Sequence, residues 1–136
     1  MRRLVPIVLC FALACGSNAP PTQPVTVSLV GTWTLHDING LVLPVVLTQT
    51  ATTKTEMLSD IVTATADGKY TEVAEARTTV NGQATVSSHT DTGTYTVTGN
   101  AVVVHSNNDG SSINGTIKGN TFTIAANGIA FEYRRP

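Results

Sequence analysis

The stretch TYTVTGNAVVV, residues 94–104, decides the fold of this chain. Threonine alternates with Tyr95 and Val97, and a period of two places both of these side chains on one face of a β-strand. Gly99 and Asn100 follow at once, and this dipeptide suits the positive φ of a mirror-type hairpin turn. The stretch therefore predicts a β-hairpin with one wet face and one buried face.

The same pattern continues through the chain after Val27. Residues 121–124 and 129–133 alternate in the same way, and threonine, which is β-branched and polar, suits the outer face of a pleated sheet. Further dipeptides carry the residues of tight turns: Asn39-Gly40, Asp67-Gly68, Asn81-Gly82, Asp109-Gly110, Asn114-Gly115, Gly119-Asn120 and Asn127-Gly128. We expect most of them to be turns, and Gly115 to lie inside a strand where another backbone comes close.

The spacing of these turns predicts an all-β fold without helices. Short connections make neighbours in sequence antiparallel neighbours in space. An up-and-down meander of eight to ten strands leaves two exposed edges unless it closes, so we expect it to close into a small barrel. Pro44 places residues 41–50 at an edge, at a bulge or in a loop that partly plugs one end. Strands are expected near residues 29–37, 42–49, 55–66, 69–80, 83–91, 93–98, 101–106, 112–118, 121–126 and 129–134.

The first residues have the pattern of a targeting segment and not of a folded domain. Arg2 and Arg3 precede an apolar run over residues 4–13, which is too short to span a bilayer as a helix. Ala12-Leu13-Ala14-Cys15 resembles a bacterial lipobox, the signal at which a leader is cut before a diacylated cysteine. The resemblance implies a lipoprotein signal peptide over residues 1–14 and an acylated Cys15 at the mature N-terminus. The alternative is an ordinary signal peptide cut after Ala14 or Ala19.

The remaining chain divides into a tether and one domain. Residues 15–26 are polar and rich in proline, which is typical of an extended linker. A chain of 136 residues fits a single core, which we place at residues 27–136. With Cys10 in the leader and Cys15 acylated, no free thiol remains. The protein would contact a membrane through its lipid, in the cell envelope, at the outer membrane or the periplasmic face.

Gly31-Thr32-Trp33 opens the first expected strand. A lone tryptophan at this position is a core residue first of all, because it buries a large area and donates its N–H to a carbonyl. Gly-x-Trp at the head of the first strand resembles the lipocalins and the bacterial lipocalin-like domains. In that family the tryptophan closes the bottom of the barrel beneath a basic residue, a role that Arg134 or Arg135 could take. The family's Thr-Asp-Tyr motif has only a loose counterpart in residues 90–95.

A second resemblance concerns residues 33–44. They are similar to the opening of the META-type envelope domain, which is also all-β. The lipocalin resemblance implies a non-catalytic monomer that binds a small hydrophobic ligand inside the barrel. The alternative is an envelope interaction or inhibitor domain that acts through its outer face or loops. The interior candidates for ligand contact are Trp33, Leu35, Tyr95, Val97, Phe122, Ile124, Phe131 and Tyr133.

Residues with catalytic or metal-binding chemistry are scattered along the chain. Ser87, His89 and Asp91 fall on one strand face but stand about 6.5–7 Å apart, which is too far for a triad, so we interpret them as a polar outer face. Glu72, Glu75 and Arg77 are interpreted as solubilising surface charges. The three histidines, His36, His89 and His105, do not cluster as metal ligands do. We therefore expect no catalytic residues, no metal and no cofactor.

The charge of the chain also limits its partners. The formal net charge is −1 at pH 7, and the sequence lacks the stripe of basic and aromatic residues that binds nucleic acid. We expect no nucleic-acid partner.

Overall fold

The computed structural model describes residues 27–135, and every regular element in this range is a β-strand. The predicted signal peptide and tether, with Cys15, lie outside the described residues. No helix of membrane-spanning length and hydropathy occurs in residues 27–135.

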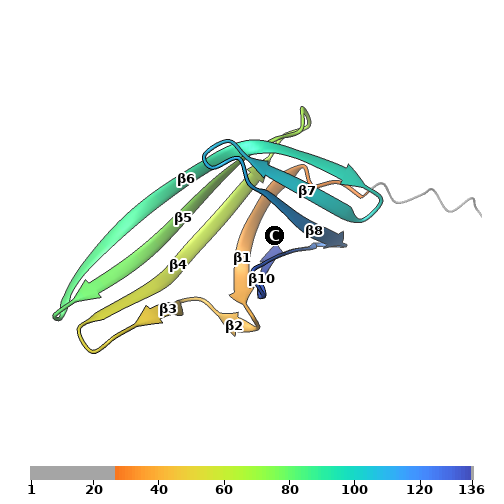
Figure 1. The fold of residues 1–136 in the computed structure, drawn as a ribbon. Helices are drawn as coiled ribbons and strands as arrows, with labels where there is room; N and C mark the ends of the chain where they lie inside the picture. The colour runs from red at the N-terminus through yellow and green to blue at the C-terminus, as the bar shows by residue number, and fades with distance from the viewer. Residues whose placement is uncertain (1–26, 136) are drawn as a thin grey trace, which may run out of the picture.

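Ten strands are joined by short turns (Figure 1). They are β1 Gly31–Ile38, β2 Leu41–Val42, β3 Val45–Gln49, β4 Thr53–Ala64, β5 Lys69–Val80, β6 Gln83–Thr98, β7 Ala101–Ser106, β8 Ser112–Lys118, β9 Thr121–Ala126 and β10 Ile129–Arg134. Asn39, Asn81 and Asn127 have positive φ and each is followed by a glycine that also has positive φ, as the mirror-type turns of the prediction require.

The strands form an antiparallel barrel. From β4 to β10 each strand pairs with its sequence neighbour, β10 pairs with β1, and β1 pairs with β4, which closes a ring of eight strands. The short strands β2 and β3 extend the sheet beside β1 and β4. This architecture confirms the predicted fold class, and the predicted strand over residues 42–49 divides at Pro44 into β2 and β3 at the edges.

The end of the barrel where β1 begins is packed solid, and we call it the closed end. Trp33 is fully buried there, and its indole N–H donates to the carbonyl of Leu29 at 2.7 Å. Phe122 lies edge-on to Trp33, with 5.8 Å between the ring centroids. The Cζ atom of Arg135 lies 4.1 Å from the centre of the Trp33 ring, and Arg135 Nη2 donates to the carbonyl of Ser28 at 2.7 Å. Arg135, and not Arg134, therefore covers the tryptophan.

At the opposite end, which we call the open end, three strands run on beyond the barrel wall. β4, β5 and β6 have 12, 12 and 16 residues, whereas β7 to β10 have six or seven. Figure 1 shows the three long strands curving together away from the shorter ones. Their inner faces therefore form a half-pipe that continues the barrel interior.

The long strand β6 corrects one expectation. Two strands were predicted over residues 83–91 and 93–98, with a break at Thr92, but the chain runs straight through. Gly93 is buried, and a Cβ atom there would meet the carbonyl of His105 and the ring of Tyr70, whose Cε1 atom would lie 2.7 Å away. The glycine lets neighbouring strands approach and does not end the strand.

Candidate binding cavity

The barrel is hollow toward its open end. Two adjoining lobes, of about 410 and 430 Å³, share four lining residues: Glu72, His89, Ile113 and Ile124. The first, the β7 lobe, reaches the loop after β7 through Ser106 and Asn108. The second, the β4 lobe, reaches β4 through Met57 and Asp60. Together they have the size expected of a site for a small organic molecule.

The two walls of this cavity differ in chemistry. The short strands supply an apolar wall, in which Ile113 of β8, Ile124 of β9 and Phe131 of β10 lie side by side in the strand order. The long strands supply carboxyl groups, namely Asp60 of β4, Glu72 of β5 and Asp91 of β6. In the β4 lobe, the small side chains of Ala74 and Ala76 line the space beside these groups.

Asp91 is fully engaged by neighbouring hydroxyl groups. The Tyr70 hydroxyl donates to its Oδ2 atom at 2.6 Å, and the Ser106 hydroxyl donates to its Oδ1 atom at 2.8 Å. Burial, followed by the hydrogen bond to Asp91, raises the pKa of Tyr70 well above its usual value. This group therefore has a structural role in joining β5, β6 and β7.

Asp60 accepts a hydroxyl hydrogen bond at only one of its two carboxylate oxygens. Its side chain is buried, with 2% of the residue exposed, and its Oδ2 atom accepts a hydrogen bond from the Tyr133 hydroxyl at 2.9 Å. The Oδ1 atom receives no hydrogen bond from a hydroxyl, amide or cationic group among the described residues, and the carboxyl group of Glu72 can bond Asp60 only when one of the two holds a proton. A buried carboxylate oxygen without a donor is costly, so this atom calls for a proton or a cation.

Glu72 lies beside Asp60 and lines both lobes. Burial raises the pKa of Glu72 to about 8, and the charges of Asp60 and Asp91, with a hydrogen bond to Asp60, act in the same direction. Burial also raises the pKa of Asp60, against the opposing effect of hydrogen bonds from Glu72 and Tyr133. Near neutral pH the two carboxyl groups therefore hold a proton between them.

The structure corrects the interpretation of three polar residues as an outer face. Ser87, His89 and Asp91 all line the cavity. They share one face of β6 with Tyr95, which lies four residues after Asp91 and is buried in the core. The sequence contained this signal, because Asp91 and Tyr95 are four residues apart and residues i and i+4 of a strand share a face. The outer-face prediction is therefore wrong.

Glu72 is corrected for the same reason. It is two residues from the buried Tyr70 and faces the cavity, so it is not a solubilising surface charge. Glu75 is exposed on β5 and accepts from Ser59 at 3.4 Å. Arg77 pairs with Glu56 at 2.8 Å.

The eight predicted interior residues divide between the two ends of the barrel. Ile124, Phe131 and Tyr133 line the cavity. The others belong to the packed core or lie against it: Trp33, Leu35, Tyr95, Val97 and Phe122. The use of any of them in ligand contact stays a prediction.

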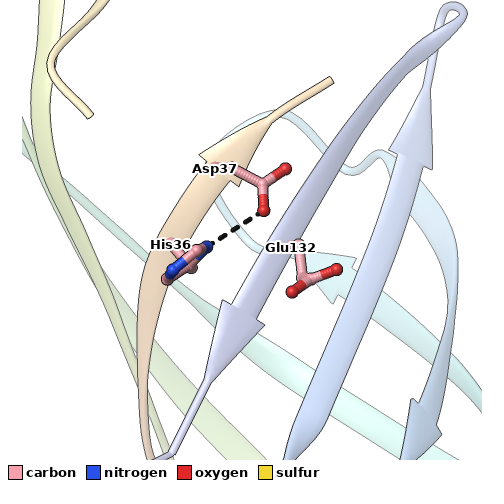
Figure 2. Close-up of side chains that lie close together, drawn as sticks. All are labelled: His36, Asp37 and Glu132. Atoms are coloured by element: carbon pink, nitrogen blue, oxygen red, sulfur yellow. Dashed lines mark hydrogen bonds and ion pairs between the residues drawn. The ribbon is translucent and has the colours of Figure 1, made fainter. Parts of the chain in front are cut away.

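A separate cluster with metal-ligand chemistry lies where β1 pairs with β10 (Figure 2). His36, Asp37 and Glu132 each place a ligand atom within 4.8 Å of the others. His36 is the extra residue of a bulge and contacts Asp37 at 3.1 Å through Nδ1. Arg134 contacts Glu132 at 2.8 Å and the Nε2 atom of His36 at 3.1 Å. The guanidinium already supplies the positive charge that these acidic groups need, so the cluster has the character of an ion-pair network.

Comparisons with known proteins agree with the barrel and its tryptophan. No curated protein matches the chain. A family model described as a lipocalin-like domain matches residues 29–128, a range that runs from the entrance to β1 through the whole of β9. The match covers more than half of the sequence and most of the closed barrel. The chain therefore belongs to the lipocalin-like domain family.

Proposed function

We propose that this protein binds a small hydrophobic molecule in the cavity and performs no chemistry on it. The observation that supports the proposal best is the open interior between the half-pipe and the apolar wall of Ile113, Ile124 and Phe131. An apolar concave surface with a few polar groups is the usual form of a small-molecule site. The lipocalin-like fold has the same typical use, although a fold does not by itself establish a function.

The test uses a neutral fluorescent probe, N-phenyl-1-naphthylamine, with the full chain carrying Cys15→Ser, so that no acyl group at this position competes. We expect the emission of the probe to rise on binding. Ala74→Trp places a large side chain in the β4 lobe and should abolish the rise.

The matched control is Val73→Trp, the adjacent residue of β5, which is exposed and points to the opposite face of the sheet. Its probe binding should equal that of the parent chain. Equal loss in both variants, or no binding by the parent, would count against a site in the cavity.

We further propose that the protein is anchored to an envelope membrane through an acylated Cys15. The support is the lipobox-like sequence of residues 12–15. Ser28 and Leu29 lie at the closed end, where they accept hydrogen bonds from Arg135 and Trp33. The first described residues therefore lie at the closed end of the barrel.

The anchor is tested by membrane fractionation of cells that express the full chain. Cys15→Ser should release the protein from the membrane fraction, whereas Cys10→Ser, a change in the predicted leader, should not. Membrane retention of the Cys15→Ser chain would contradict acylation at this residue. The likeness of residues 33–44 to META-type domains stays a prediction.

A second candidate function rests on the edge of β6. Residues 83–91 pair with β5 on one side, while β7 joins the other side only from Gly93 onward. Val86 is 57% exposed within this segment. An open sheet edge can bind an extended peptide as an added strand, which is how an envelope interaction or inhibitor domain would use it. Added protection of the backbone amides of this edge would be its signature.

A further inference from the structure

We infer that the cavity selects amphipathic molecules that carry a protonated amine, with the ammonium group seated between the carboxyl groups of Asp60 and Glu72. The inference rests on the proposed function and names the class of ligand. The apolar part of such a molecule would lie against Ile113, Ile124 and Phe131, which form the facing wall of the same lobe.

Asp60 has one carboxylate oxygen that is free to bind a cationic group. The residue is only 2% exposed, lines the β4 lobe, and leaves its Oδ1 atom without a hydroxyl, amide or cationic donor among the described residues. Buried carboxylates are normally paired with a cation or with several donors. An ammonium group offers three N–H donors in a compact charge, so it can satisfy Asp60 Oδ1 and Glu72 together.

The charge balance of the whole cavity also favours a cation. No lysine or arginine among the described residues lines either lobe. The titratable groups that face the carboxyl pair come from β4, β5, β6, β10 and the loop after β7, and are Asp60, Tyr70, Glu72, His89, Asp91, Asp109 and Tyr133. Strands β8 and β9 contribute only apolar or small side chains to these lobes. The field inside the cavity therefore favours a cation and opposes a carboxylate ligand.

The carboxyl pair of Asp60 and Glu72 already holds a proton that an ammonium group can replace. Burial keeps Glu72 protonated up to a pKa of about 8. A bound ammonium group would take the place of this proton. It would supply the same positive charge and three N–H donors. Amine binding should therefore release a proton near pH 7, and it should strengthen as the pH rises from 6 to 8.5, below the usual pKa of an alkylamine of about 10.4.

The experiment compares three ligands with the same apolar chain: octylamine, 1-octanol and octanoate. Each is titrated against the bound N-phenyl-1-naphthylamine probe at pH 7.5, with the full chain carrying Cys15→Ser. We expect octylamine to displace the probe at a concentration at least tenfold lower than 1-octanol, and octanoate to be the weakest. Calorimetry in two buffers of different ionisation enthalpy should show proton release for octylamine and none for 1-octanol.

Two variants assign the preference to the carboxyl pair. Asp60→Asn and Glu72→Gln should each reduce the preference for the amine over the alcohol to less than threefold, with displacement by 1-octanol unchanged. Glu75→Gln, on the opposite face of β5, is the matched control and should keep the full preference. The readout is the ratio of amine binding to alcohol binding. A general loss of stability would weaken the binding of both ligands and would leave this ratio unchanged.

The outcomes separate this inference from the proposed function. Equal displacement by octylamine and 1-octanol would overturn the preference for amines and leave hydrophobic ligand binding intact. A preference that persists in both Asp60→Asn and Glu72→Gln would overturn the assignment to this pair. Failure of the parent chain to bind the probe at all would overturn the proposed function, and the inference with it.

Discussion

Glu72 shows how one inward-facing residue affects both stability and binding. Its pKa rises from an ordinary value of 4.5 to about 8 because the side chain is buried beside two other carboxyl groups. In the unfolded chain the proton is lost near the ordinary value. Between pH 4.5 and pH 8 the folded state therefore binds more protons, and the free energy of unfolding falls as the pH rises through this range.

The first prediction is that Glu72→Gln removes this pH dependence. At pH 8 the variant should have a free energy of unfolding higher than that of the parent by on the order of 1 kcal/mol, a value reduced for partial solvent screening. At pH 4 the two chains should be alike. Urea denaturation at both pH values measures the difference. A variant that is less stable than the parent at pH 8 would show that Glu72 is not held in its protonated form.

The second prediction at this scale concerns Gly93. A methyl group there would meet the His105 carbonyl and the Tyr70 ring, and strand backbone can make room only by breaking the pairing of β6. Gly93→Ala should lower the free energy of unfolding by about 3 kcal/mol. Thr92→Ala, an exposed neighbour on the same strand, should cost less than about 1 kcal/mol. Thermal unfolding of the two variants provides the comparison, and similar melting temperatures would contradict the steric account.

Most strand boundaries could be predicted from the sequence, because the dipeptides Asn-Gly and Gly-Asn mark tight turns. The prediction failed at Thr92, where it placed a break between two strands, although β6 continues through this residue. It also failed to separate the inner from the outer face of β5 and β6. At the open end both faces of these two strands are polar, because their inner face lines an open cavity. The alternation of hydrophobic and polar residues therefore stops where the packed core ends.

The third prediction concerns the free edge of β6. Every second backbone amide between Ala84 and Asp91 points away from β5, and β7 reaches the strand only at Gly93. These amides should exchange their hydrogens with little protection at neutral pH, whereas most amides of residues 93–98 should be well protected. Hydrogen exchange followed by NMR resolves the alternation. Uniform protection along all of β6 would mean that another strand covers this edge.

The whole molecule combines a solid end with a hollow end. The closed end is held by Trp33, Phe122 and Arg135, whose roles follow from the Gly-x-Trp pattern and the last strand. The hollow end depends on three strands being longer than the rest, and on carboxyl groups far apart in sequence meeting inside the barrel. Asp60 lies opposite Ala74, and so diagonal to Glu72, in the register of β4 against β5. This register follows a bulge between Met57 and Ser59. The sequence pattern does not reveal such a bulge, so it could predict the barrel but not the acidic wall.

The central claim is that this hollow end holds a small apolar molecule. The most direct test is methyl NMR of the full chain carrying Cys15→Ser, mixed with N-phenyl-1-naphthylamine. We expect intermolecular nuclear Overhauser effects from the probe to the methyl groups of Ile113, Ile124 and Ala74, and their loss in Ala74→Trp. Effects that reach only outward-facing methyl groups such as those of Val73 and Val86, or the absence of any binding, would contradict this claim.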